Sequence, residues 1–323
     1  MATAHADPRC PVTILTGWLG SGKTTLLNRL LAEPGGRRFA VLVNEFGDLG
    51  VDQRLVTHAT EDLIELANGC VCCTVRGDLV AALRRLHRRR SGGLLRRPRP
   101  FDAVLLETTG IAEPAPLLRT FLVEAGISAL YRVAAVIALV DARHAELALA
   151  ERAAAEQIAV ADLVVLNKTD LAGAAALADL ETRLRALNPA APVRRAVQAA
   201  LPVEDVLAER PPRAPDSLPE HAGHEHGGIA AVALREAAPL EEMKVELWLR
   251  SCLRLQGAEL IRYKGFLNLR GRAERVVLQG VYELFQADAG APWGSDPRAT
   301  ELVFIGRGLD AALLRRGLDA CRA

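Results

Sequence analysis

The chain has 323 residues, half of them hydrophobic, and a formal net charge of +1 at pH 7. This composition predicts a globular protein of one large domain or two ordinary ones with an ample core, and it excludes a disordered chain. The near-zero charge gives no argument for binding to nucleic acid or to a membrane.

The longest apolar candidate, residues 133–140, is far too short to span a membrane. Residues 1–11 lack the charged and apolar regions of a signal peptide. We therefore expect a cytoplasmic protein without a membrane partner, in a compartment where thiols stay reduced. The six cysteines are then candidates for metal binding or catalysis before disulfides. No aromatic residues interleave the arginine-rich segment 84–99, which disfavours nucleic acid as a partner.

The first predicted element is a buried strand at residues 12–15, and a helix is predicted at 25–31. Between them lies G-x-x-x-x-G-K-T, the pattern of a phosphate-binding loop. Backbone N–H groups of such a loop point at phosphate oxygens, and the helix start adds partial positive charge. We expect Lys23 to reach the outer phosphates and the Thr24 hydroxyl to hold Mg²⁺. The residues predicted to contact the nucleotide here are Gly17, Gly20, Ser21, Gly22, Lys23, Thr24 and Thr25.

A second strand, predicted at residues 39–43, ends at a loop rich in glycine and carboxylates, residues 44–52. In phosphate-loop proteins, the loop at this place often senses the terminal phosphate. Glu45, Asp48 and Asp52 can bind a second metal or orient water, and Glu45 is a candidate catalytic residue. A solvated turn is the alternative interpretation.

The third motif is Gly-Cys-Val-Cys-Cys at residues 69–73, between a strand predicted at 60–66 and a helix predicted at 74–90. A position just before a helix start favours the thiolate, the form that binds metal. In an extended backbone Cys70 and Cys72 share one face, and Cys73 needs a turn to join them. The set Cys70, Cys72 and Cys73 suits Zn²⁺ or Cu(I), with Co²⁺, Ni²⁺ or Fe²⁺ possible, and leaves a fourth position open. A redox disulfide, Cys72–Cys73 or Cys70–Cys73, is the alternative.

A short apolar strand predicted at residues 103–106 ends in Glu-Thr-Thr-Gly. An acidic residue that closes a buried strand beside a phosphate loop is the usual second holder of Mg²⁺. We assign this role to Glu107, which joins Lys23 as a candidate catalytic residue. The N–H of Gly110 is predicted to contact the terminal phosphate. A helix at 114–123, a strand at 131–140 and a helix at 145–158 are predicted next.

A further strand, predicted at residues 163–166, ends in Asn-Lys-Thr-Asp and precedes a helix predicted at 174–187. Guanine offers N1–H and a 2-amino group as adjacent donors, and one carboxylate can accept both, whereas adenine presents an acceptor at N1. We therefore expect Asp170 to select GTP over ATP. Lys168 can lie along the base plane, and Asn167 can fix the loop.

Alternation of strands and helices over residues 12–206 implies a mainly parallel sheet flanked by helices, with the ligand at the carboxyl ends of the strands. The composition of residues 210–228 predicts a linker. This linker is either a polar tether or a segment that binds metal weakly through His221, His224 and His226. The remainder is predicted to form a smaller α/β domain, with strands at 229–234, 259–269, 276–285 and 302–305 and helices at 240–255 and 309–321. The predicted division is a tail 1–11, a P-loop GTPase domain 12–207, a linker 208–228 and a C-terminal α/β domain 229–323.

Taken in order, the motifs GWLGSGKTT, NEFGDLGVD, GCVCC, ETTG and NKTD resemble those of the CobW-like GTPases, metal chaperones related to UreG and HypB. The stretches RYKGFLNL and ELVFIGRGLD are similar to that family's C-terminal domain. The resemblance covers nearly the whole chain, and a Glu at position 107 agrees with it. It implies a P-loop NTPase fold, binding of GTP and Mg²⁺, and a client metalloprotein as partner. A second copy of the chain is a possible further partner.

The resulting hypothesis is a GTP-hydrolysing metallochaperone with zinc as the first-choice metal. GTP and Mg²⁺ would order the loop at 45–52 and complete the cysteine site, and hydrolysis would release the metal to the client. Slow turnover is expected, because the sequence shows no clear arginine finger or positioned glutamine apart from Gln53. The alternatives are a metal-storage protein with a structural nucleotide site and a nucleotide-dependent thiol redox switch.

Overall fold

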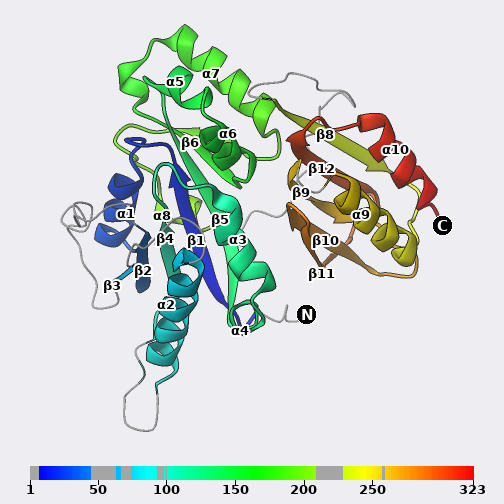
Figure 1. The fold of residues 1–323 in the computed structure, drawn as a ribbon, viewed down its shortest axis with the longest axis horizontal. Coiled ribbons are helices and arrows are strands. Elements are labelled where there is room, and N and C mark those ends of the chain that lie inside the picture. The colour runs from blue at the N-terminus through cyan, green and yellow to red at the C-terminus, as the bar shows by residue number, and fades with distance from the viewer. Residues whose placement is uncertain are drawn as a thin grey trace.

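The computed structural model describes residues 7–44, 63–66, 74–92, 98, 100–208, 228–256 and 259–323. The chain forms two sheets, a larger one near the N-terminus and a smaller one near the C-terminus (Figure 1). No helix in the described part of the chain combines the length and the apolar character needed to cross a membrane.

The larger sheet has seven strands in the order β3-β2-β4-β1-β5-β6-β7, and every neighbouring pair is parallel. This confirms the predicted P-loop NTPase fold. The strands are β1 Cys10–Gly17, β2 Phe39–Asn44, β3 Leu63–Leu66, β4 Ala103–Glu107, β5 Tyr131–Asp141, β6 Leu163–Asn167 and β7 Val193–Arg195. The helices are α1 Lys23–Ala32, α2 Thr74–Ser91, α3 Pro114–Val123, α4 Ala125–Ser128, α5 Ala145–Leu149, α6 Arg152–Ala159, α7 Ala174–Leu187 and α8 Val203–Leu207, with a 3₁₀ turn, η2 Thr169–Leu171.

The strands of this sheet are apolar at successive positions, so both faces of the sheet have to be buried. Helices cover both faces. α1 and α8 pack on one face through side chains such as Leu27 and Val206. α2, α3, α6 and α7 pack on the other face, where Leu83, Leu118 and Leu184 are buried. The parallel register places the carboxyl ends of β1, β4, β5 and β6 side by side, at the same end of the sheet.

The smaller sheet has five strands in the order β11-β10-β9-β12-β8, all antiparallel. Its elements are β8 Ile229–Glu236, α9 Glu242–Gln256, β9 Leu260–Leu267, β10 Glu274–Val281, β11 Leu284–Pro292, β12 Thr300–Arg307 and α10 Ala311–Ala320. α9 and α10 cover the face of this sheet that points away from the larger body (Figure 1). The predicted smaller C-terminal α/β domain is confirmed, and its sheet is antiparallel.

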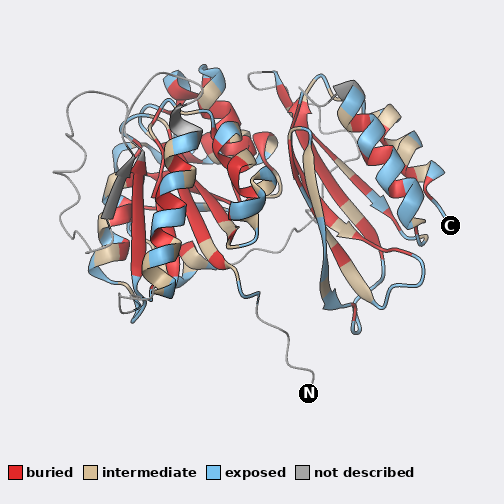
Figure 2. Cartoon of the chain, turned by 60° about the horizontal axis from the view of Figure 1, so that its bottom comes forward, coloured by how far each residue is buried: buried red, intermediate tan, exposed pale blue. Residues whose placement is uncertain are grey.

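The other face of the smaller sheet packs on the helices of the larger body. Along β12, Leu302 and Phe304 join the core beneath α9 and α10, while Val303 and Ile305 join the core shared with the larger sheet. Burial on both faces explains why this strand is continuously apolar. Figure 2 shows buried residues along strands of both sheets and exposed residues on the outer sides of the helices. The two bodies therefore share one apolar interface.

Two sequence predictions were wrong in detail. The helix predicted at 145–158 is two short helices, because Glu151 is extended (ψ 129°) and interrupts the helical backbone before α6 begins at Arg152. The strand predicted at 276–285 is a hairpin, because the chain reverses between β10 and β11 at Tyr282, whose φ is 52°. In both places tertiary packing overrides an apolar pattern that fits one continuous element.

Candidate nucleotide-binding site

The loop between β1 and α1 requires glycine at two of its turns. Gly17 has a φ of 136°, and a Cβ there would lie 2.3 Å from the Leu139 carbonyl oxygen. Gly22 has a φ of 105°, and its Cβ would lie 2.4 Å from Asn167 Nδ2. Both backbones approach neighbouring strands too closely for a side chain. The loop is thereby held against the ends of β5 and β6.

Polar groups line the inside of this loop. The Lys23 ammonium is buried and donates hydrogen bonds to the carbonyl oxygens of Gly17 (2.8 Å) and Trp18 (3.1 Å). Ser21 is fully buried, and its hydroxyl oxygen has no hydrogen-bond partner among the described residues. A buried polar atom without a partner calls for an explanation, and a bound phosphate would supply one here. The loop therefore fits a phosphate, which both side chains can contact.

The end of β4 brings a carboxylate to the start of α1. Thr24 Oγ1 donates a hydrogen bond of 2.7 Å to Glu107 Oε1. Glu107 is 4% exposed, and the register pairs it with Leu15, two residues before the loop. A hydroxyl and a carboxylate are hard oxygen donors, the type that Mg²⁺ prefers. These two residues thus fit a magnesium ion, which would neutralise charge on phosphate oxygens when bound.

The segment after Glu107 touches the phosphate loop directly. A Cβ on Gly110 would lie 2.6 Å from the backbone nitrogen of Leu19. The N–H of Thr108 donates to the Leu15 carbonyl oxygen (2.9 Å), which continues the β1–β4 pairing up to this point. Gly110 therefore lies against the phosphate loop, and its contact with the terminal phosphate stays a prediction.

The end of β6 carries the predicted base-recognition residues. Asn167 is 1% exposed; its Nδ2 donates to the Ser21 carbonyl oxygen (2.9 Å), and its Oδ1 accepts from the N–H of Ala199 (2.7 Å). One side chain thus ties the phosphate loop to a second loop, which lies 32 residues beyond Asn167 in the chain. Lys168 has a left-handed backbone (φ 59°), and Asp170 lies exposed on η2. Through Asn167, the structure joins this motif to the phosphate loop.

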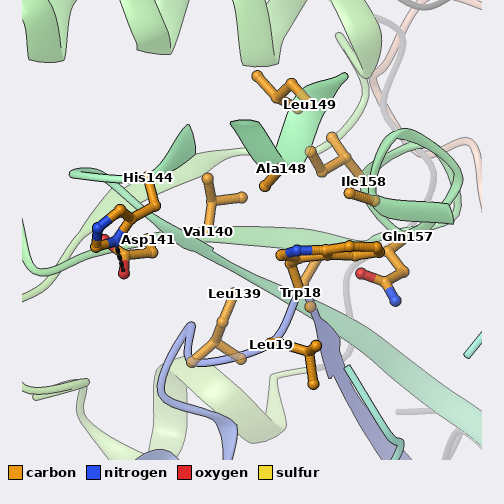
Figure 3. A pocket seen from close by; sticks show the side chains of 13 residues that line it. Trp18, Leu19, Leu139, Val140, Asp141, His144, Ala148, Leu149, Gln157 and Ile158 are labelled. Carbon is orange, nitrogen blue, oxygen red and sulfur yellow. Dashed lines mark hydrogen bonds and ion pairs between the residues drawn. The ribbon is translucent and has the colours of Figure 1, made fainter. Parts of the chain in front are cut away.

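Asp141, at the end of β5, was not predicted as a site residue. Its Oδ2 accepts hydrogen bonds from Lys168 Nζ (2.8 Å) and His144 Nδ1 (3.0 Å), and its Oδ1 accepts from the N–H of Arg143 (2.9 Å). Burial by itself would raise the pKa of the Asp141 carboxyl, but these hydrogen bonds outweigh it and hold the pKa below its ordinary value. The negative charge fixes the Lys168 side chain. Figure 3 shows the Asp141–His144 contact at one end of a small pocket beside Trp18.

The loop after β7 was also missed. Gln198 (φ 50°) and Ala199 (φ 53°) both have left-handed backbones, which is uncommon outside glycine. Thr169 donates to the Ala196 carbonyl oxygen through its N–H (3.2 Å) and its hydroxyl (3.1 Å). This loop therefore lies at the base-recognition motif with a fixed backbone. Nothing in the local sequence marks it, because it contains no glycine.

Comparison with known proteins adds to this geometry. Residues 11–195 match the nucleotide-binding domain of the CobW/HypB/UreG family, and residues 229–322 match the C-terminal domain of the cobalamin synthesis protein CobW. The chain belongs to this family. Its nucleotide-binding domain is therefore established, in agreement with the resemblance seen in the sequence.

Similar proteins cover nearly the whole length of the chain. It is 32% identical to the zinc chaperone YjiA of Escherichia coli over 96% of this chain and 98% of that protein. It is 34% identical to the zinc chaperone CobW of Pseudomonas aeruginosa, over 98% and 92%. The crystal structure of Zn(II)-bound YjiA GTPase superposes with a TM-score of 0.71 at 30% identity, covering 98% of this chain and 99% of that one.

Several predicted residues lie outside the described part of the chain. They are Glu45, Asp48, Asp52, Gln53, Cys70, Cys72, Cys73, His221, His224 and His226. Among the described residues, no group of three or more His, Cys, Asp or Glu side chains is placed to hold a metal ion. The transition-metal site thus stays a prediction from the sequence.

Asp170→Asn is expected to weaken GTP binding roughly 100-fold or more. The aspartate carboxylate has two charged oxygens that can accept both guanine N–H groups, whereas the asparagine amide has one neutral oxygen. Xanthosine triphosphate, with a carbonyl at position 2, should bind this variant better than GTP does. Titration calorimetry with both nucleotides measures the change. Asp179→Asn, an exposed carboxylate on α7, is the matched control. Unchanged GTP affinity in Asp170→Asn would remove Asp170 from the guanine site.

Proposed function

We propose that this protein is a GTP-hydrolysing metallochaperone that carries a transition metal, zinc first, to a client protein. The observation that carries the proposal is the meeting of three motifs at one edge of the sheet. These are the phosphate loop, the Thr24–Glu107 pair and the Asn167–Asp170 loop. The names of the full-length relatives, zinc chaperones, support the choice of metal.

In this proposal, GTP draws the Lys23 ammonium away from the two carbonyl oxygens it now contacts and onto the outer phosphates. Loop N–H groups and Lys23 stabilise charge that develops on the phosphate oxygens as water attacks. Thr24 and Glu107 would hold Mg²⁺. The N–H of Gly110 contacts the terminal phosphate, so hydrolysis removes one contact to this segment. Intrinsic turnover should be slow, as expected from the sequence.

The link to the metal is the segment that carries the cysteines. β3 ends at Leu66, which pairs with Asn44 at the end of β2, and α2 begins at Thr74. The described residues on both sides of the cysteine motif thus adjoin the same sheet whose strands β1 and β4 carry the phosphate site. A nucleotide that orders the loops at this end of the sheet can raise the metal affinity of Cys70, Cys72 and Cys73. Bound metal would then raise the affinity for that nucleotide by the same factor.

The test is zinc affinity measured by competition with a chromogenic chelator. The protein is loaded with Mg²⁺ and either a non-hydrolysable GTP analogue or GDP. We expect roughly 5- to 150-fold tighter binding with the GTP analogue, and loss of that difference in Cys72→Ser. Cys252→Ala is the matched control, because the Cys252 thiol is buried in the apolar core of the C-terminal domain, where burial raises its pKa to about 11.

Equal affinities in the two nucleotide states would contradict the coupling and favour a storage protein. A thiol redox switch would instead show loss of titratable thiols after mild oxidation whether or not Zn²⁺ is bound. Co²⁺ and Ni²⁺ titrated in the same assay rank the metals.

A further inference from the structure

The buried helix α6 holds the segment that follows Glu107. Gln157 is 1% exposed, and its Nε2 donates hydrogen bonds to the carbonyl oxygens of Gly110 (3.1 Å) and Ala112 (3.0 Å). Gly110 in turn lies against the backbone of Leu19 in the phosphate loop. One amide group thus fixes the place of the loop that is predicted to contact the terminal phosphate.

The neighbouring residue on α6 faces the C-terminal domain. Glu156 is 1% exposed. Its Oε2 accepts a hydrogen bond from the Tyr282 hydroxyl (3.1 Å), and its Oε1 lies 2.9 Å from Arg307 Nη2 and 2.9 Å from Arg152 Nε. Arg307 ends β12 and Tyr282 lies in the turn between β10 and β11, so both belong to the C-terminal domain. A carboxylate buried this deeply depends on these partners, because an unpaired buried charge is costly.

Tyr282 occupies a strained position at the tip of the β10–β11 hairpin. Its φ of 52° is rare for an aromatic residue, and such strain persists only where the surroundings hold it. The next residue, Glu283, forms an ion pair with Arg119 of α3. α3 starts at Pro114, four residues after Gly110. The hairpin tip therefore contacts α3 and α6, the two helices that hold the Gly110–Ala112 loop.

We propose that Gln157 is a positioning residue for GTP hydrolysis, and that the C-terminal domain sets its position through Tyr282 and Glu156. The inference rests on the proposed GTPase function. Movement of the hairpin tip shifts α6, and Gln157 carries this shift to the Gly110–Ala112 loop. Since coupling is reciprocal, the nucleotide state also changes how tightly the C-terminal domain is held. A protein that binds the C-terminal domain would thereby alter the rate of hydrolysis.

The test compares steady-state GTP hydrolysis by the full-length protein and three variants. Gln157→Leu should lower kcat roughly 10- to 100-fold, because misplacement of the loop harms the chemical step. Tyr282→Phe, which removes only the hydroxyl bonded to Glu156, should lower kcat roughly 3- to 10-fold. KM for GTP should change less than about twofold in both, since the base and the inner phosphates are bound by other elements. The double variant should be no slower than Gln157→Leu, because both changes act through one route.

Tyr131→Phe is the matched control, because its buried hydroxyl donates to the Leu83 carbonyl oxygen on α2 (3.0 Å) rather than to α6 or the β10–β11 hairpin. It should leave kcat unchanged. Equal kcat values for Tyr282→Phe and Tyr131→Phe would overturn the coupling while the GTPase function stands. Wild-type turnover no faster than that of Lys23→Ala would overturn both. Should Gln157→Leu fail to fold, Tyr282→Phe still decides the coupling, since it keeps the shape of the side chain.

Discussion

Replacing Lys23 with alanine is expected to lower kcat for GTP hydrolysis on the order of 10²- to 10³-fold, the usual effect of losing one preorganised donor to transition-state charge. Lys23 is buried at the start of α1, and its ammonium contacts the Gly17 and Trp18 carbonyl oxygens at 2.8 and 3.1 Å. It is therefore already inside the phosphate loop. Phosphate oxygens offer it a stronger, charge-assisted contact than two neutral carbonyls do.

Phosphate release measured under saturating GTP tests this prediction. Lys244→Ala is the matched control, because the Lys244 ammonium donates to the Arg322 carbonyl oxygen on the surface of the C-terminal domain. It should hydrolyse GTP at the wild-type rate. Turnover in Lys23→Ala equal to that of the wild type would mean that the site does not hydrolyse nucleotide, and the nucleotide would then be structural.

Replacing Asp162 with asparagine is expected to lower the free energy of unfolding by about 3–5 kcal/mol, the usual cost of breaking a buried ion pair. Asp162, Arg262 and Lys264 are 7%, 6% and 4% exposed, and both cations lie 3.3 Å from Asp162 Oδ1. Burial by itself would raise the pKa of the Asp162 carboxyl, but Lys264, Arg262 and the N–H of Val136 outweigh it and hold the pKa below its ordinary value. Asparagine would leave both buried cations without this counter-charge.

Urea unfolding followed by tryptophan fluorescence measures this loss in both bodies, since Trp18 lies in the phosphate loop and Trp248 on α9. Asp179→Asn, an exposed change on α7, should stay within about 0.5 kcal/mol of wild type. Adding Lys264→Met to Asp162→Asn should recover part of the loss, because it removes one of the stranded charges. Equal stabilities of Asp162→Asn and Asp179→Asn would show that the three-residue cluster does not hold the domains together.

Local pattern in the sequence was sufficient to place the main elements and the nucleotide motifs. The predicted helices at 114–123 and 174–187 match α3 and α7 residue for residue. Pro114 suits the first turn of a helix, and α7 has leucines at helical spacing on its buried side. Each predicted nucleotide motif in the described chain follows a buried strand. Parallel strands end at one edge, so strand order along the chain was enough to bring the motifs together.

Only the tertiary structure showed which residues complete the site. Asp141 fixes Lys168 from the neighbouring strand, and the loop with Gln198 and Ala199 is held by Asn167 and Thr169. A hydrogen bond between side chains on different strands does not change the hydrophobic periodicity of either segment. It could therefore not be predicted from the sequence pattern.

The junction between the two bodies was equally hidden from the sequence. Arg262 contacts Asp162 across 100 residues, and Tyr282 contacts Glu156 across 126. A continuously apolar sequence indicates that a strand such as β12 is buried on both faces. It does not indicate which elements cover each face. Composition and residue spacing were therefore sufficient to predict the helices and strands, the phosphate loop and the Asn167–Asp170 motif. The partners across the domain interface were decided by packing, because long-range contacts depend on how faces meet in space and not on residues close in the chain.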